Sequence, residues 1–521
     1  MTTMGREFTL ALPVMLLAAL VTGLAFWQPM PVLDAIYLPD DTYYTLAIAR
    51  NLAAGSGPSA GGGIVTSGFQ PLIAFLAMPV FLAGLDGEAA VAAVIALSGL
   101  FGVLAAGMAA VLIGRWSGSR AAALAGGAFM ATSPLLLSNN LNGLETSLAG
   151  FLALLALALA DRIGRQARPG RAVGLGVVIG LALLARIDSA LIVLLIGLML
   201  LVRAGIRPTA VTVAAALVTV APWWLYCLAT FGSVVPESGE AVRQITAFHR
   251  EQGLTTVTAL LYGLAVAGLF VMPLALPVGL LPQLAVILLL AVPILGAVRR
   301  RRVEGLAVLA AAGFLIGLLY VFHVPAFWFF ERYFYLLFLA LAVAGAVLGA
   351  RLARRAGRGA APIAGLAGAG LVALNLVALA PYLQGDVTAS KRGIDGVKGY
   401  AASARAVLAA LPAEAVVGAM QSGAIAFFAP LVRPGVEVVN LDGVVNGAAH
   451  AAIRAERLAD YLEARRVSHF ADWELNRRML ERYLGPGAAR LALEPVADMP
   501  PQDPSHRFRL WRLRAAGAAG S

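Results

Sequence analysis

Two adjacent carboxylates, Asp40 and Asp41, follow Pro39 in the segment LPDDTYYTLAIARN of a mostly apolar chain. A carboxylate close to a hydroxyl can act as a general base in proton transfer. Aspartate is also a favoured N-cap, and a helix is predicted to start here and run to about Ala54. A cap uses one carboxylate, so the second favours a functional site. Asp40 is the preferred base because it directly follows the rigid Pro39, with Asp41 as the alternative.

The segment after this helix, GSGPSAGGGIVTSGFQPL, has six glycines between Gly55 and Gly68. Glycine permits tight turns and lets a backbone approach a ligand closely. The segment lacks the strand, the helix and the lysine of a nucleotide P-loop. A flexible loop is therefore the favoured interpretation, ahead of a phosphate-binding loop.

Three further charged residues interrupt apolar segments. Glu145 occurs in SNNLNGLETSL, and Arg186 and Asp188 occur in LLARIDSALIVLL. Charged groups between two apolar runs are costly unless they are paired or face an aqueous cavity. Arg186 and Asp188 therefore form either a structural ion pair or part of a cavity wall. Glu145 either caps a helix or supports the same site.

Arginines near the polar loops could bind a phosphate, because a guanidinium fork matches phosphate oxygens. Helix-end arginines that extend toward the membrane surface are the competing interpretation. The five histidines show no HxxxH spacing, and no GxSxG nucleophile motif occurs. No metal ligands are identified from the sequence. The phosphate-binding candidates are Arg186, Arg243, Arg250 and Arg332.

The composition of the 521-residue chain indicates a membrane protein. It is 60% hydrophobic and 13% charged, with a mean hydropathy of +0.84, whereas soluble domains are about 25% charged. The net charge of +11 is dispersed between apolar runs, which excludes the compact basic face of a nucleic-acid-binding protein. The single cysteine, Cys227, cannot form an internal disulfide.

Runs of about 20 apolar residues predict membrane-spanning helices. Cytoplasmic loops are enriched in Lys and Arg, and this rule places the N-terminus inside. Residues 71–85 and 256–272 are expected to be juxtamembrane or re-entrant helices, and counting them as spans would give thirteen without moving either terminus. The eleven predicted spans are residues 9–27, 89–114, 121–137, 144–160, 172–186, 189–204, 208–228, 276–298, 303–322, 333–350 and 361–382. The arginines of the inside loops are Arg115, Arg120, Arg162, Arg165, Arg168, Arg171, Arg203, Arg207, Arg299, Arg300, Arg301, Arg302, Arg351, Arg354, Arg355 and Arg358.

Hydropathy falls after about Pro381, which divides the chain into a membrane domain, residues 1–382, and a soluble domain, residues 383–521. AVVGAM, VEVVNL, SHFADW and RFRLWRL have strand character, whereas residues 403–411 and 451–466 have helical periodicity. The predicted fold is an α-helical polytopic membrane protein with a mixed α/β C-terminal domain. With the N-terminus inside, an odd number of spans places that domain on the outer side of the membrane, which is also the side of the acidic loops.

Several of these motifs resemble the glycosyltransferase C (GT-C) superfamily, in particular the bacterial arabinofuranosyltransferase branch. The segments that carry the resemblance are PDDTYYTLAIARNLAAGSG, NNLNGLETSL, LLARIDSAL, FGSVVPESGEA, FERYFYLL and VVNLDGVVN. The resemblance implies an inverting enzyme of the bacterial cytoplasmic (inner) membrane. Such an enzyme transfers a sugar, such as the pentose arabinofuranose, from a polyprenyl-phosphate donor to an extracytoplasmic glycan or glycolipid.

The same resemblance implies roles for individual residues. The catalytic base is an acid of the first outer loop, which carries over to Asp40 or Asp41, and a second acidic position carries over to Glu145. The base would activate an acceptor hydroxyl while the anomeric carbon loses its lipid phosphate. Arginines would stabilise the departing charge, with or without a divalent cation such as Mg²⁺ or Mn²⁺.

Two other classes of function remain as alternatives. A secondary transporter predicts polar residues near the centres of spans and two matching halves. A non-catalytic lipid-binding assembly factor predicts that both aspartates are dispensable. The concentration of polar residues at one membrane face, together with an appended soluble domain, favours the transferase.

Overall fold

The computed structural model describes residues 3–163, 168–273, 280–357, 359–390, 399–503 and 506–515. Arg165 and Arg358, two of the predicted inside-loop arginines, lie outside the described residues. The chain divides into two compact units. Unit 1 comprises residues 1–27, 95–226 and 254–386, and unit 2 comprises residues 28–94, 227–253 and 387–521. Unit 2 thus combines the C-terminal segment with two earlier stretches that hold Asp40, Asp41, Arg243 and Arg250.

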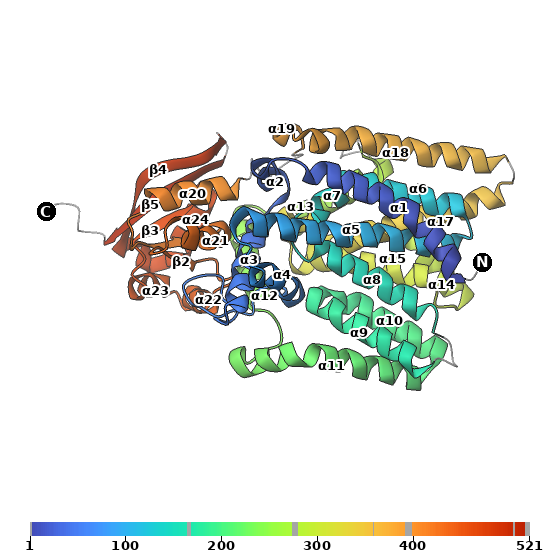
Figure 1. Cartoon of the computed structure of the whole chain (residues 1–521), viewed down its shortest axis with the longest axis horizontal. Coiled ribbons are helices and arrows are strands. Elements are labelled where there is room, and N and C mark those ends of the chain that lie inside the picture. The colour runs from blue at the N-terminus through green and yellow to red at the C-terminus, as the bar shows by residue number, and fades with distance from the viewer. Residues whose placement is uncertain are drawn as a thin grey trace. The chain divides into compact units, whose positions relative to one another are not determined.

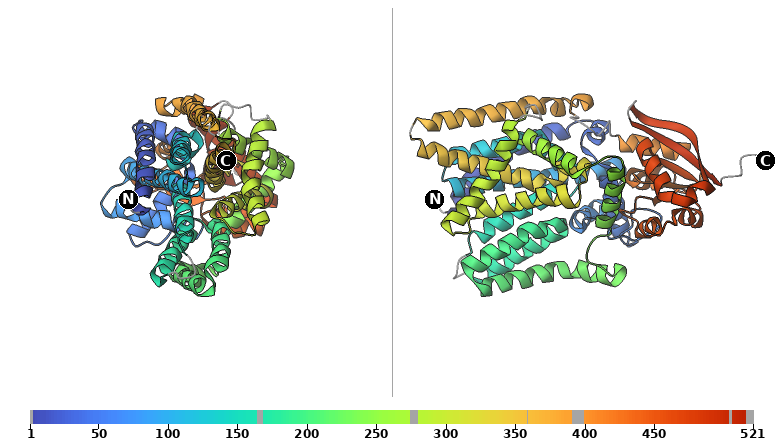
Figure 2. Two further views of the ribbon diagram at one scale, coloured as in Figure 1. Left: turned by 90° about the vertical axis from the view of Figure 1, so that its right-hand side faces the viewer. Right: turned by 180° about the vertical axis from the view of Figure 1, so that it is seen from behind.

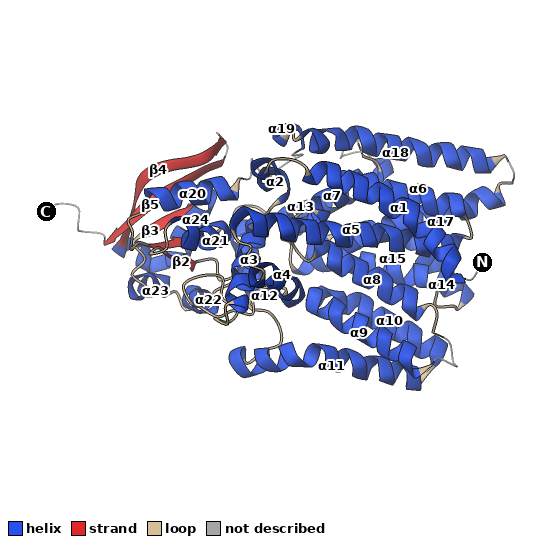
Figure 3. Cartoon of the chain, in the orientation of Figure 1, coloured by secondary structure: helices blue, strands red, loops and turns tan. Residues whose placement is uncertain are grey.

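Unit 1 consists of helices (Figures 1 and 3). Among them α15 packs against α17, α8 against α9, and α1 against α6. The long helix α5 begins in unit 2, and the long helix α11 ends there. The helices are α1 (Thr3–Phe26), α5 (Gly87–Ser117), α6 (Arg120–Thr132), α7 (Pro134–Asn140), α8 (Thr146–Ala160), α9 (Pro169–Ala185), η1 (Ile187–Ser189), α10 (Ala190–Ala204), α11 (Ile206–Phe231), α13 (Thr256–Val271), α14 (Leu280–Arg300), α15 (Gly305–Leu318), η2 (Leu319–His323), η3 (Phe327–Phe329), α16 (Phe330–Tyr333), α17 (Tyr335–Arg355) and α18 (Ala360–Gln384).

The structure confirms a polytopic, helical membrane protein. Among the described residues, eight helices are long and apolar enough to cross a membrane, or up to ten if each of two bent helix pairs counts as one span. The described residues of each of the eleven predicted spans lie mainly in helices, and residues 276–279 of the eighth span lie outside the described residues. Three of the predicted spans do not correspond to a single helix of 18 residues or more. One is the pair α6 and α7, bent by 64°, and the other two are the shorter apolar helices α8 and α9.

Burial separates the inner helices of unit 1 from the outer ones. Of the 18 most apolar consecutive residues in Gly305–His323, which contains α15, 61% are buried. In α18 the corresponding share is 17%. Apolar side chains that remain exposed on α18, such as Leu366, suit contact with lipid tails. Gly176 and Gly180 of α9 permit its close approach to α11, because a Cβ at either position would lie 2.4 to 2.5 Å from an α11 atom.

Unit 2 contains a five-stranded sheet with the order β2-β1-β3-β5-β4 (Figure 3). Strands β1, β2 and β3 are parallel, whereas β5 is antiparallel to β3 and β4. The strands are β1 (Val416–Ala419), β2 (Glu437–Asn440), β3 (His469–Trp473), β4 (Leu491–Asp503) and β5 (His506–Ala515). The helices are α2 (Met30–Tyr37), α3 (Asp40–Ala53), α4 (Pro71–Leu82), α12 (Ser238–Glu251), α19 (Val387–Ser390), α20 (Tyr400–Ala410), α21 (Gly423–Val432), α22 (Gly447–Arg454), α23 (Leu458–Ala464), α24 (Glu474–Leu484) and η4 (Gly485–Arg490).

The predicted mixed α/β character of the C-terminal segment is confirmed (Figure 2, right). The four predicted strands coincide with β1, β2, β3 and β5. Strand β4 was not predicted, because Pro495, Pro500 and Pro501 interrupt its pattern. Proline is tolerated in a strand at the edge of a sheet, and β4 lies at the edge.

Two parts of the glycine-rich segment are packed against other residues of unit 2. Residues 58–60 and 66–69 are buried. A Cβ at Gly68 would lie 1.7 Å from the carbonyl oxygen of Val444, and one at Gly61 would lie 2.9 Å from that of Val438. The glycines therefore allow close approach to the backbone of the chain itself.

Candidate functional site

Asp40 is the first residue of α3, and its carboxylate binds a different helix. Its two oxygens accept hydrogen bonds from Gly423 N at 2.7 Å and Ala424 N at 2.9 Å, the first two residues of α21. The residue is 4% exposed. The first N–H groups of a helix have no partner within that helix, so an aspartate that accepts from them acts as a cap. Asp40 therefore caps a helix that lies almost 400 residues further along the chain.

A second carboxylate binds the turn that leads into α21. Asp472, at the end of β3, accepts from Met420 N at 2.7 Å and Gln421 N at 3.0 Å. With the strand order β2-β1-β3, the connections from β1 and β3 run to opposite sides, which creates a topological switch point. Open α/β sheets bind ligands at such points. Here the chain's own carboxylates occupy the N–H groups of this turn.

Asp41 lies in the same first helical turn but is only partly buried. The electrostatic influence of Asp41 extends to Asp40 and to Asp442, which follows β2. Asp442 is itself engaged, because its Oδ1 accepts a hydrogen bond from Val444 N at 2.8 Å. Of the two adjacent aspartates, Asp41 is thus the one more accessible to solvent, whereas both oxygens of Asp40 hold α21.

Burial raises the pKa of three carboxyl groups in unit 2. The pKa of Asp40 rises to about 8, mainly through burial; the two backbone N–H donors oppose the rise, and repulsion from Asp41 and Asp472 adds to it. Burial likewise raises the pKa of Asp442 to about 7 and that of Asp472 to about 6.

We expect the stability of unit 2 to fall as pH rises. Each of these carboxyl groups has a higher pKa in the folded chain than the roughly 3.9 of an unfolded aspartate, so the folded state retains protons that the unfolded chain has released. Stability is therefore lost from about pH 4 up to about pH 8. Thermal unfolding midpoints should decrease from about pH 5 to about pH 9, and less so for Asp40→Asn. An increase over this range would contradict the prediction.

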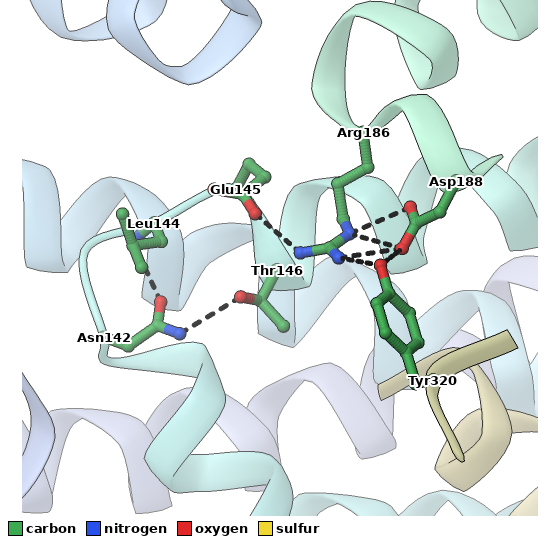
Figure 4. Close-up of polar contacts among 7 residues, drawn as sticks. All are labelled: Asn142, Leu144, Glu145, Thr146, Arg186, Asp188 and Tyr320. Atoms are coloured by element: carbon green, nitrogen blue, oxygen red, sulfur yellow. Dashed lines mark hydrogen bonds and ion pairs between the residues drawn. The ribbon is translucent and has the colours of Figure 1, made fainter. Parts of the chain in front are cut away.

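Unit 1 holds a separate polar network at the junction of α9 and α10 (Figure 4). The Arg186 guanidinium lies between two carboxylates: Nη1 is 2.8 Å from Glu145 Oε1, and Nη2 is 2.8 Å from Asp188 Oδ2. Nε also donates to Asp188 Oδ1 at 3.0 Å, so the contact with Asp188 is bidentate. All three residues are candidates predicted from the sequence, and the structure brings them together.

Tyr320 completes this network and was not among the sequence candidates. Its hydroxyl accepts from Arg186 Nη2 at 3.1 Å and donates to Asp188 Oδ2. Tyr320 lies in the π-helical turn η2, a distortion that often occurs at functional sites. A single tyrosine in an apolar run gives no sequence signal for this role.

Arg332 lies against aromatic rings in the same unit. Its guanidinium carbon is 4.5 Å from the ring centre of Phe329 and 5.4 Å from that of Tyr333. The Arg186 guanidinium is 5.2 Å from the same Tyr333 ring, which stacks on Tyr320 at 4.2 Å. Tyr333 therefore links Arg186 and Arg332 through cation–π contacts.

The other two candidate arginines lie in unit 2, on α12. Arg243 and Arg250 are seven residues apart on this helix, hence on the same side, and both are exposed. Arg243 is 3.8 Å from Glu240, a long surface contact. Within the described part of the chain, no group of three or more histidines, cysteines or acids is arranged to hold a metal ion.

Comparison with known proteins finds similarity in structure alone. No protein-family model matches the chain, and no curated protein sequence matches it significantly. The crystal structure of ArnT from Cupriavidus metallidurans bound to undecaprenyl phosphate has a TM-score of 0.54 and 17% identity, covering 97% of this chain and 98% of that one. Apo ArnT gives 0.52 and 16% over the same shares.

The apo oligosaccharyltransferase from Archaeoglobus fulgidus gives a TM-score of 0.53 and 16% identity, covering 89% of this chain and 69% of that one. These likenesses do not favour the arabinofuranosyltransferase branch. They extend over nearly the whole chain, and they confirm that it has the predicted GT-C fold.

Proposed function

We propose that the chain is a membrane glycosyltransferase that moves a sugar from a polyprenyl-phosphate donor to an envelope polysaccharide or glycolipid. Its fold supports this function, because ArnT with the same fold was crystallised with undecaprenyl phosphate. A pentose such as arabinofuranose is the donor sugar favoured by the sequence resemblance. The observation that carries the catalytic assignment is the different burial of the two aspartates: Asp40 is buried and holds two backbone N–H groups of α21, whereas the adjacent Asp41 is partly exposed.

In this proposal Asp41 is the general base. Its carboxylate, within about 3 Å of an acceptor hydroxyl, takes the proton as the acceptor oxygen bonds to the anomeric carbon. The bond from that carbon to the lipid phosphate breaks, and its electron pair leaves with the phosphate. A single displacement inverts the anomeric configuration.

The departing phosphate needs positive charge around it. Arg186 is already paired with Glu145 and Asp188, so we assign it, together with both acids, a supporting role. Arg332, Arg243 and Arg250 are the proposed phosphate-binding residues.

A transfer assay tests the proposal. The purified chain in lipid nanodiscs is given synthetic undecaprenyl-phosphate donors that carry radiolabelled pentoses or hexoses, with an envelope extract as acceptor. Transfer of label from lipid to acceptor supports the transferase. Donor binding without transfer for any sugar would favour the assembly factor, and uptake of free solute into proteoliposomes would favour the transporter.

We also propose that the C-terminal segment lies outside the cytoplasmic membrane. A reporter fused after Arg300 should signal inside, and one fused after Ser521, which lies outside the described residues, should signal outside, because the arginine-rich loops are retained in the cytoplasm. Alkaline phosphatase and green fluorescent protein fusions measure the two sides. A cytoplasmic signal after Ser521 would contradict this topology.

A further inference from the structure

Helix α3 is held by α21 at both of its ends. At its start, Asp40 accepts from Gly423 N and Ala424 N. Near its end, Arg50 donates from Nη1 to the carbonyl oxygen of Phe427 at 3.0 Å, and its guanidinium carbon lies 5.0 Å from the centre of the Phe427 ring. Arg50 is also 3.3 Å from Asp86. The two attachments are ten residues apart, so they fix the orientation of α3 as well as its position.

The contact at the start of α3 requires glycine. A Cβ at Gly423 would lie 2.3 Å from the carbonyl oxygen of Asp40 and 2.8 Å from Tyr44 N. Both are backbone atoms of α3, which cannot move aside as a flexible side chain could. The close approach of the two helices therefore depends on Gly423 having no side chain.

Aromatic contacts fix the first turn of α3 as well. Tyr43 is fully buried, and its ring centre lies 6.0 Å from that of Phe427 and 5.7 Å from that of Phe428 on α21. Its hydroxyl donates to Asp34 Oδ1 at 2.7 Å. Asp34 Oδ2 in turn accepts from Ala401 N at 3.0 Å, in the first turn of α20.

We propose that α21 is the element that positions the catalytic base, with Asp40, Gly423 and Arg50 as positioning residues. The inference rests on the proposed function, in which Asp41 is the base. Asp41 directly follows the anchored residue Asp40, so any movement of the α3 N-terminus moves Asp41 with it. A displacement of about 1 Å at a reacting group can cost 100-fold in rate. The C-terminal segment is thus a support for catalysis.

Two variants disturb the contact in different ways. Asp40→Asn replaces one of the two acceptor oxygens by an NH2 group, which donates and so cannot accept from Gly423 N or Ala424 N. Gly423→Ala inserts a methyl group while leaving both aspartates intact. Turnover at saturating donor should fall by about 10-fold or more, with the donor KM changed less than about twofold, because misplacing a base lowers kcat rather than donor binding.

Matched controls are available in the same unit. Asp460→Asn removes an exposed carboxylate that pairs with Arg457 and Arg490. Gly239→Ala adds a methyl group in the first turn of α12, where no atom lies within 4 Å of the new Cβ. Both controls should retain wild-type turnover. In addition, hydrogen exchange of the peptide that contains residues 423 and 424 should be faster in Asp40→Asn than in Asp460→Asn.

The outcomes separate the inference from the proposed function. Wild-type turnover and exchange in folded Asp40→Asn and Gly423→Ala, with Asp41→Asn inactive, would overturn the positioning role alone. A fully active Asp41→Asn variant would show that Asp41 is not the general base and would contradict the catalytic assignment of the proposed function. If Gly423→Ala does not fold, Asp40→Asn and Arg50→Gln decide: reduced turnover with unchanged undecaprenyl-phosphate binding supports the inference, and wild-type turnover in both overturns it.

Discussion

Replacing Asp41 by Asn is expected to lower turnover by about 100-fold or more, the range that general bases contribute. Asparagine keeps the shape of aspartate and one acceptor oxygen, but its amide is not basic enough to take the proton. Binding of undecaprenyl phosphate should remain, because the proposed phosphate contacts come from arginines. Asp41 is partly exposed, so the substitution should leave the thermal unfolding midpoint nearly unchanged. Turnover is measured with the best donor of the transfer assay.

Comparison with Asp40→Asn makes this test specific. Loss of a general base mainly lowers kcat. It also removes the acid limb of the pH–rate profile, which is the fall in rate at low pH that protonation of the base causes. Asp40→Asn should keep that limb while turnover falls less, because the basic group is still present. If Asp41→Asn and Asp40→Asn both transferred sugar at the wild-type rate, the aspartate pair would be structural and the transferase proposal would lose its main residue-level support.

From the sequence, Asp40 is the preferred base because it directly follows Pro39, whereas the proposed function assigns the base to Asp41. The preference could not have been tested from the sequence, because the groups that bind Asp40 lie on residues 423 and 424. Capping is a local rule when helix and cap are neighbours in the chain. Here a cap and its helix are far apart, and only the folded chain brings them together.

The membrane part could be predicted far better than the polar contacts. In their described residues, the predicted spans lie mainly in helices. In lipid each span must satisfy its backbone hydrogen bonds within itself, so it is visible in the sequence as a long apolar run. Strand β4 and Tyr320 were missed for the opposite reason. The edge position of β4 and the partners of Tyr320 are set by distant residues.

Glu145 changes the expected effect of exchanging the charges of Arg186 and Asp188. From the sequence, Arg186 and Asp188 form either a structural ion pair or part of a cavity wall, and a simple ion pair would tolerate exchange of its two charges. In the structure Arg186 also binds Glu145, which is 4% exposed. Exchange of the two charges would leave an acid at position 186 beside Glu145, so we expect the exchange to restore stability only in part.

Removing the cation from this network is expected to have the largest effect on stability. Arg186→Leu leaves Glu145 and Asp188 without their shared counter-charge. Breaking a buried ion pair by removing one partner costs roughly 3 to 5 kcal/mol, because the remaining charge is desolvated and uncompensated. The thermal unfolding midpoint in detergent should therefore fall strongly, and bound undecaprenyl phosphate should not restore it fully.

The triple variant Glu145→Gln, Arg186→Leu, Asp188→Asn distinguishes charge from packing. It removes every formal charge of the network while keeping similar volumes, so it should recover much of the stability lost in Arg186→Leu. The matched control is Arg300→Leu, because Arg300 forms an exposed pair with Glu304 at 3.2 Å, and exposed pairs contribute about 0 to 1 kcal/mol. Equal unfolding midpoints for Arg186→Leu and Arg300→Leu would show that the network does not stabilise the fold. Its two acids would then need a role in substrate binding to explain why they are buried around one arginine.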